Sequence, residues 1–378
     1  MVMQNRPPMG WNSWNSFGPE IGEAIVKESA EALLDTGLAE LGYRYVNVDD
    51  FWQSEKRIDG RLRWDDETFP SGIPALADTL HRKGLKLGLY SCAGPMTCGG
   101  RPGSYGHERI DAETFAEWGV DLLKYDYCHL PPGVDGRRLC ERMGRELAAS
   151  GRSIVYSLCE WGRGDPWEWA AYAGATMWRI SGDIDDRWES IVDVGFSRLS
   201  ELAPYAGRGR WNDPDTLVVG MHGVGNREVA DGVGCTEAEY RSHFLLWCLT
   251  AAPLLIGADV RNLDEQSLTL LSNPAAVAVN QDPLGVPARR IGRVEHGGET
   301  AEVWARPLSG GRTAVGVFNM GLHAGRRVPV AWESLGWDAR TTFSVRDALG
   351  GGEDIRRSDV SVAVGSHDAA LLILEPVD

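Results

Sequence analysis

The sequence predicts an α/β fold in which a (β/α)8 TIM barrel is followed by a C-terminal antiparallel β-sandwich domain. Over the first three quarters of the chain, eight short apolar or β-branched runs alternate with longer amphipathic stretches. Eight such units in about 280 residues have the count and length of a TIM barrel. Beyond that point no helix of normal length intervenes, and short strand-like runs are separated by glycine-rich turns.

The eight candidate barrel strands are separated by helical stretches. They are Met9–Trp14, Tyr43–Asp49, Leu85–Ser91, Leu122–Asp126, Ser153–Cys159, Ala175–Ile180, Gly209–Asp213 and Leu254–Ala258. Strands that alternate with helices pair in parallel, because each crossover returns the chain to the same end of the sheet. From this pattern alone, a doubly wound open sheet is the alternative.

The stretches between the strands carry helix signals. Ile21–Leu41 has apolar residues at helical spacing, and Ile73–Lys83 is followed by a glycine, which is typical of a helix C-terminus. Thr236 and Glu239 form a capping-box pattern ahead of the apolar stretch Phe244–Leu249. These segments supply the crossovers that a parallel barrel requires.

The last quarter of the chain predicts a small β-sandwich of about 90 residues. Its candidate strands are Val303–Pro307, Thr313–Phe318, Arg327–Trp332, Thr341–Arg346 and Ala369–Leu374. We therefore expect two domains, a catalytic barrel over residues 1–287 and an antiparallel β domain over residues 288–378.

Charge and composition exclude several classes of function. The chain has 38 basic and 54 acidic residues, a net charge of −16, so it is a poor partner for nucleic acid or anionic lipid. The nearly apolar run Phe244–Ala258 contains Pro253 and is shorter than the roughly 18 residues of a membrane span. The N-terminal residues do not resemble a secretory signal, so we expect a cytoplasmic protein, or a secreted one if a leader was removed. The sequence leaves open whether the protein forms a homo-oligomer.

Acidic residues gather where a TIM barrel carries its active site, at the C-terminal ends of the strands. Four candidate strands end in or lead into such residues: Asp49 and Asp50, Asp126, Asp183, and Asp215. A single aspartate at such a junction is more often a helix N-cap. Four acidic strand ends are hard to explain as four caps, so we expect a cluster of carboxylates at the barrel mouth.

Two of these carboxylates have the setting of a catalytic pair. Lys124 and Asp126 lie two residues apart on one strand and so share a face, where the ammonium would keep the carboxylate ionised, as a nucleophile requires. Asp183 lies on a loop near Arg179, and a less cationic setting would let it act as an acid. Two carboxyl groups of divided role are the equipment of glycosidic bond cleavage, which needs no metal and no cofactor.

Other chemistries lack their sequence signatures. The chain contains no P-loop, HExxH, GxSxG or complete GxGxxG motif. The seven cysteines are odd in number and include no CxxC pair. Cys92, Cys98, His107, Cys128 and His129 fall near two strand ends and leave a metal site as a minor alternative. The 15 tryptophans suit either sugar stacking or ordinary packing.

Eight sequence blocks run in order along nearly the whole chain. They are Met9–Trp14, Val48–Asp50, Gly84–Tyr90, Gly119–Asp126, Cys159–Trp161, Trp178–Arg179, Trp211–Asp215 and Asn280–Gly285. Together they resemble the signature blocks of glycoside hydrolase family 27, the α-galactosidase family. The fold of that family, a (β/α)8 barrel followed by an antiparallel β domain, agrees with the fold that the elements predict.

The resemblance implies a retaining exo-α-galactosidase that acts on small neutral galactosides by double displacement. Asp126 matches the family's nucleophile and Asp183 its acid/base residue. The positions that match sugar-binding residues or line the site are Trp14, Asp49, Asp50, Tyr90, Cys98, Lys124, Cys159, Glu160, Trp161, Arg179 and Asp215. Asp49 and Asp50 would accept hydrogen bonds from O4 and O6 of galactose, and Lys124 would donate to O3 and O4.

The same resemblance bears on the alternatives. Cys159 and Trp161 match a loop that faces the sugar 2-position, and their bulk disfavours an α-N-acetylgalactosaminidase. The Asp49–Asp50 pair disfavours a β-L-arabinopyranosidase, whose substrate lacks the hydroxymethyl group. Both remain alternatives, as does a non-catalytic galactoside-binding protein.

Three further positions bear on this resemblance. Thr216 stands where many relatives have Met. Cys98 and Cys128 match a disulfide of secreted relatives, although a cytosolic setting would favour free thiols.

Overall fold

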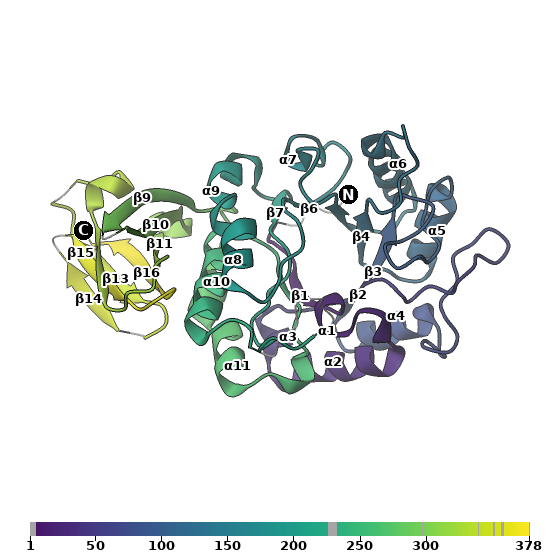
Figure 1. The fold of residues 1–378 in the computed structure, drawn as a ribbon, viewed down its shortest axis with the longest axis horizontal. Coiled ribbons are helices and arrows are strands. Elements are labelled where there is room, and N and C mark those ends of the chain that lie inside the picture. Colours follow the sequence, from purple (N-terminus) through teal and green to yellow (C-terminus); the bar gives the residue numbers. More distant parts are fainter. Residues whose placement is uncertain are drawn as a thin grey trace.

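The protein is described by a computed structural model covering residues 5–225, 233–296, 298–338, 340–350, 352–356 and 359–377. Figure 1 shows two parts side by side, a barrel surrounded by helices and a smaller body of strands that holds the C-terminus. Of the described helices, none is long and apolar enough to cross a membrane.

The first part is an eight-stranded parallel barrel. Its strands are β1 (Met9–Asn12), β2 (Tyr45–Val48), β3 (Lys86–Cys92), β4 (Leu122–Asp126), β5 (Val155–Cys159), β6 (Met177–Arg179), β7 (Trp211–Asp213) and β8 (Leu254–Ile256). They pair in the order β7-β6-β5-β4-β3-β2-β1-β8, and a parallel bridge between Leu217 and Ile256 joins the segment after β7 to β8. All eight predicted strands are confirmed. The open-sheet alternative is wrong, because the first strand pairs with the last.

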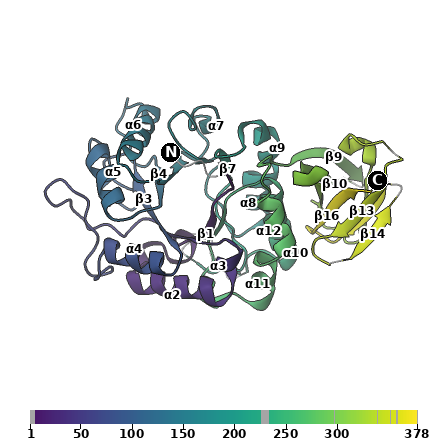
Figure 2. The ribbon, with the colours of Figure 1, turned by 180° about the vertical axis from the view of Figure 1, so that it is seen from behind.

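Helices surround the barrel, as Figures 1 and 2 show from opposite sides. The α-helices are α1 (Trp14–Phe17), α2 (Glu23–Asp35), α3 (Leu38–Leu41), α4 (Ile73–Arg82), α5 (Glu108–Glu117), α6 (Gly136–Ala149), α7 (Pro166–Trp169), α8 (Trp188–Ile191), α9 (Leu199–Leu202), α10 (Glu237–Leu249), α11 (Glu265–Leu271) and α12 (Pro274–Asn280). The short turns are η1 (Gly18–Glu20), η2 (Val192–Phe196, a π-helix), η3 (Ala203–Tyr205), η4 (Val260–Asn262), η5 (Ser309–Gly311) and η6 (Trp332–Leu335).

Local sequence explains several helix boundaries. The helix predicted over Ile21–Leu41 is divided into α2 and α3 because Gly37 adopts a φ of 77°, which interrupts the helix. The predicted capping box is confirmed, since the side chains of Thr236 and Glu239 each accept a hydrogen bond from the other residue's backbone amide at the start of α10. Trp14 lies outside β1 and begins α1, which places its side chain beyond the strand end.

The C-terminal part is built from antiparallel strands. They are β9 (Arg289–His296), β10 (Glu299–Pro307), β11 (Thr313–Asn319), β12 (Arg326–Val330), β13 (Phe343–Asp347), β14 (Glu353–Arg356), β15 (Val360–Val364) and β16 (Ala369–Pro376). Six form a sheet in the order β14-β13-β16-β11-β10-β9, and β12 pairs with β15. The five predicted strands are confirmed, whereas β9, β14 and β15 were not predicted. The first two are rich in charged residues and lie at the sheet edges, where polar side chains obscure the strand pattern.

One face of the six-stranded sheet packs against the barrel. Trp304, Phe318 and Leu371 belong to the same buried cluster as the barrel core, and Figure 2 shows α10 lying beside this sheet. Arg306 on β10 is fully buried there, and its Nη1 donates to the carbonyl oxygen of Cys248 at 2.8 Å. Burial lowers the pKa of Arg306 to about 10. One hydrophobic cluster therefore continues from the barrel onto this face of the sheet, while the C-terminal part also has a separate cluster of its own.

Candidate active site

A cavity of about 410 Å³ opens among the C-terminal ends of the barrel strands. Its lining residues are Asn12, Trp14, Asn15, Asp49, Asp50, Tyr90, Cys98, Lys124, Asp126, Trp161, Arg163, Arg179, Gly182, Asp183, Asp215 and Thr216. Both predicted catalytic residues and nearly all predicted binding residues are therefore gathered in one place. Parallel strands produce this convergence, since all their C-terminal ends meet at one mouth.

Lys124 lies between two carboxylates but pairs with only one of them. Its Nζ is 2.8 Å from Oδ2 of Asp49, and the same oxygen accepts a hydrogen bond from Nδ2 of Asn12 at 2.9 Å. Burial opposes the charge of Lys124, yet the nearby acids raise its pKa above the ordinary value. Asp49, Lys124 and Asn12 thus form a fixed polar group on the cavity wall.

Asp126 ends β4 and is almost completely buried, with 4% of its surface exposed. One carboxylate oxygen accepts a hydrogen bond from the Tyr127 amide at 2.8 Å. Burial raises the pKa of Asp126 to about 6, the charge of Lys124 opposes this, and the negative charges of Asp183 and Asp49 add to it. Lys124 thus favours the ionised form of Asp126, as expected from sequence, but burial raises the pKa by more than Lys124 lowers it. At pH 7 a pKa of about 6 still leaves roughly ten ionised carboxylates for each protonated one.

Asp183 lies on the loop after β6, and its side chain is 47% exposed. Nη2 of Arg179 is 3.0 Å from Oδ1 of Asp183 and 3.1 Å from Oδ2 of Asp215. The expectation of a less cationic setting for Asp183 is therefore wrong as stated. Arg179 is nevertheless shared, since the same nitrogen also donates to the carbonyl oxygens of Ser181 and Gly182. The clearer contrast with Asp126 is exposure to solvent.

Asp50 is held by backbone amides of two segments. Its Oδ2 accepts from Gly99 at 2.7 Å and its Oδ1 accepts from Phe51 at 2.8 Å. Burial raises the pKa of Asp50, and these hydrogen bonds oppose the rise. Both carboxylate oxygens have a donor, so the carboxylate has a fixed orientation at the cavity.

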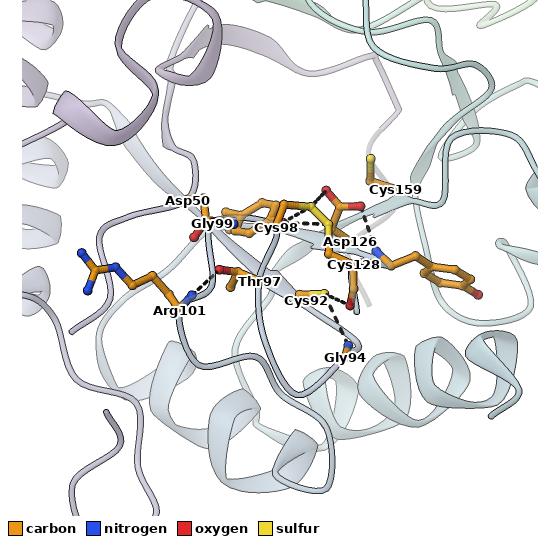
Figure 3. Close-up of a disulfide and its surroundings, with 12 residues drawn as sticks. Asp50, Cys92, Gly94, Thr97, Cys98, Gly99, Arg101, Asp126, Cys128 and Cys159 are labelled. Atoms are coloured by element: carbon orange, nitrogen blue, oxygen red, sulfur yellow. Dashed lines mark hydrogen bonds between the residues drawn. A yellow bond between two sulfur atoms is a disulfide. The ribbon is translucent and has the colours of Figure 1, made fainter. Parts of the chain in front are cut away.

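The loop that supplies the Gly99 amide is tied to the end of β4. Cys98 and Cys128, the pair that the resemblance implied, form a disulfide with their Cα atoms 5.1 Å apart. Figure 3 shows the disulfide beside the carboxylate of Asp126, with Sγ of Cys98 4.0 Å from Oδ2. Cys98, Cys128 and Asp126 are close enough together to suggest a metal site. Both sulfurs are used in the disulfide, however, and it is the thiolate that binds metals.

Of the predicted site residues at the end of β5 and just after it, some line the cavity and others do not. Trp161 lines the cavity, and the guanidinium carbon of Arg163 lies 4.7 Å from the Trp161 ring centroid. Cys159 is buried beneath the lining, with Sγ 3.8 Å from Nη1 of Arg179. Glu160 does not line the cavity, because its Oε2 accepts a hydrogen bond from the Gly164 amide at 2.8 Å. A direct contact of Glu160 with substrate is thus not favoured by this geometry.

Four lining residues were missed by sequence reasoning: Asn12, Asn15, Arg163 and Gly182. Each lies within two residues of a predicted one, so adjacency along the chain was the available signal. Thr216, noted only as a departure from relatives, also lines the cavity, and its Oγ1 accepts from Nδ2 of Asn15 at 3.2 Å.

Comparison with known proteins places these features in a family. Residues 6–282 match the family model described as alpha galactosidase A, and residues 298–374 match that of the alpha galactosidase C-terminal beta sandwich domain. The α-galactosidase of Cyamopsis tetragonoloba is 44% identical over 98% of this chain and 86% of its own length.

Solved structures agree with the sequence matches. The α-galactosidase I of Mortierella vinacea superposes with a TM-score of 0.89 at 31% identity, over 98% of this chain and 97% of that one. A β-L-arabinopyranosidase from Geobacillus stearothermophilus reaches a TM-score of 0.87 at 26% identity, over 99% and 97% of the two chains. The chain therefore belongs to the α-galactosidase family, glycoside hydrolase family 27.

Proposed function

We propose that this chain is a retaining exo-α-galactosidase that releases terminal α-D-galactose from neutral galactosides by double displacement. The main support for the proposal is that Asp126 and Asp183 line the same cavity, which is large enough to hold a sugar ring. The names of relatives such as the Cyamopsis tetragonoloba enzyme support the choice of galactose.

In the first step, a carboxylate oxygen of Asp126 attacks the anomeric carbon and forms a galactosyl ester. The bond from that carbon to the leaving oxygen breaks, and Asp183 gives its proton to that oxygen. In the second step, Asp183 takes a proton from water, which attacks the same carbon and releases both galactose and Asp126. Two inversions at the anomeric carbon give net retention.

The environments of the two residues suit these roles. Asp126 is buried yet mostly ionised at neutral pH, and a desolvated carboxylate is a better nucleophile than a hydrated one. Asp183 is about half exposed, so water can reach it for the second step. Its exposed position also leaves room for the departing group, whose structure differs from one galactoside to another.

The polar wall supplies recognition of the sugar hydroxyls. Asp49 and Asp50 offer carboxylate acceptors, and Lys124 offers ammonium donors, all on the same cavity. We assign Asp50 to O6 and the Asp49–Lys124 pair to the O3–O4 side. A pentopyranoside would leave Asp50 without its hydroxymethyl partner, which disfavours the arabinopyranosidase alternative.

The cytoplasmic location of the protein stays a prediction from the sequence.

The experiment that tests this proposal is a panel of three nitrophenyl glycosides: the α-galactoside, the β-L-arabinopyranoside and the α-N-acetylgalactosaminide. We expect the α-galactoside to have the highest kcat/KM, and its product to form first as α-galactose in the proton NMR spectrum. A higher kcat/KM for either other glycoside would overturn the substrate assignment. Galactose binding without turnover of any of the three would identify a binding protein instead.

A further inference from the structure

Glu160 is a buried acid that the proposed reaction does not use. Its side chain belongs to the fully packed interior, with 3% of the residue exposed. Oε2 accepts the Gly164 amide at 2.8 Å, while Oε1 is buried and has no hydrogen-bond partner among the described residues. Since an unpaired buried oxygen is costly, the retention of a carboxylate here needs an explanation.

The turn that Glu160 closes has a demanding backbone. Trp161 and Gly162 have φ values of 58° and 72°, in the region that side chains with a Cβ rarely adopt. A Cβ at Gly162 would also lie 2.3 Å from the carbonyl oxygen of Ile180. Hydrogen bonds therefore have to hold this turn in place.

Three contacts fasten the turn. The Arg163 amide donates to the carbonyl oxygen of Glu160 at 3.3 Å, and the Gly164 amide donates to the Glu160 carboxylate. Nε1 of Trp169 donates to the Gly164 carbonyl oxygen at 2.8 Å. The carboxylate thus links the first and last residues of a segment whose middle residues, Trp161 and Arg163, line the cavity.

We propose that Glu160 is a positioning residue for the hydrolysis proposed above: its carboxylate holds the Gly164 amide and thereby sets Trp161 and Arg163 on the cavity wall against the bound sugar. The inference rests on the proposed function for its assay. Glu160 then acts on the bound sugar indirectly, through the loop, and not by the direct contact that was expected from the sequence.

The surroundings of Glu160 make this hold sensitive to protonation. Asp165 and Arg163 face it from its own loop, Tyr127 from the end of β4, and Cys140 from α6. Burial raises the pKa of Glu160 to about 7, with a contribution from Asp165, while the Gly164 amide and Arg163 oppose the rise. An ionised carboxylate is a stronger acceptor than a neutral acid, so the turn is held more firmly above pH 7 than below it.

The test replaces Glu160 with Gln, which keeps an acceptor oxygen for Gly164 but carries no charge at any pH. The matched control is Glu168→Gln, an exposed acid eight positions along the chain. For each protein, kcat and KM for the nitrophenyl α-galactoside are measured from about pH 6 to about pH 8.5, a range that spans the Glu160 titration.

We expect the KM of the wild type and of Glu168→Gln to rise about fivefold as pH falls through 7, the factor for weakening one charge-assisted hydrogen bond. Glu160→Gln should show the high KM at every pH, with kcat within about twofold of the wild type. A KM profile in Glu160→Gln that still changes through pH 7 as the wild-type profile does would overturn the proposal.

The inhibition constant of free galactose provides a second readout that requires no variant. It should also rise as pH falls through 7 in the wild-type enzyme, and a constant value over that range would contradict the proposal even if Glu160→Gln fails to fold. Absence of hydrolysis by the wild type would instead refute the proposed function, so the two failures are distinguishable.

Discussion

Replacing Lys124 with Met removes the cation that lowers the pKa of the proposed nucleophile, without adding bulk. Lys124 and Asp126 are two residues apart on β4, which separates their Cα atoms by about 6.6 Å along the strand. At an effective dielectric constant of about 20, two charges at that distance interact by about 2.5 kcal/mol. The ratio of ionised to protonated Asp126 should therefore fall about seventyfold at any given pH.

The consequence is a change in the pH dependence of activity, and its sign follows from the role of Asp126. The pKa of Asp126 is about 6 in the wild type, so protonation of Asp126 should make kcat/KM fall as pH drops through about 6, below the change near pH 7 that is assigned to Glu160. In Lys124→Met the carboxylate should be only about one eighth ionised at pH 7. The fall in kcat/KM should then begin at higher pH, in addition to a loss at all pH values from the missing contact to the sugar.

The assay is kcat/KM for the nitrophenyl α-galactoside as a function of pH. Lys124→Arg keeps the positive charge, so its kcat/KM should fall at the same low pH as that of the wild type. Its absolute activity should be lower, because the planar guanidinium group does not replace the ammonium group that pairs with Asp49. Lys86→Met is the matched control, since Lys86 begins β3 at the opposite end of the barrel. If kcat/KM of Lys124→Met falls at the same low pH as that of the wild type, Lys124 does not control the ionisation of Asp126.

Two further predictions concern stability. Replacing Cys98 and Cys128 by Ser should lower the free energy of unfolding by about 3.5 kcal/mol, the chain-entropy value for a 30-residue separation; it should also raise KM, because the loop that orients Asp50 is released. An unchanged urea midpoint would contradict this. Arg306→Leu should cost about 3 kcal/mol, since buried carbonyl oxygens lose their donor, while kcat/KM at room temperature is retained. The control Arg340→Leu, at an exposed side chain, should change the urea midpoint little, and an equal change in both variants would contradict the proposed role of the buried guanidinium.

The barrel and most of its site follow from the sequence because they depend on short-range regularities. Alternation of apolar runs with helical stretches specifies eight parallel strands, and parallel strands bring their C-terminal residues to one mouth. That geometry alone gathers Asp50, Asp126 and Asp215, which lie far apart along the chain. Strands such as β14 (Glu353–Arg356) were missed because they lie at a sheet edge, where burial does not select an apolar face.

What the sequence could not provide is the direction of side chains on loops. Asp183 was expected in a less cationic setting, yet Arg179 reaches it because both flank the same turn after β6. Glu160 was expected in the cavity, yet its carboxylate points to Gly164. In both cases at least one member of the contact, Asp183 or Gly164, lies on a loop whose backbone dihedrals are not determined by residue type.

The proposed mechanism requires a covalent bond between Asp126 and galactose, and this intermediate can be trapped. A fluorinated α-galactosyl donor with a good leaving group slows hydrolysis of the ester, so the galactosyl enzyme accumulates and its peptides can be mapped by mass spectrometry. We predict one added fluorogalactosyl group per chain, on the peptide that contains Asp126, and none in Asp126→Asn. A label on another carboxylate, or turnover of the donor with no labelled peptide, would contradict the account.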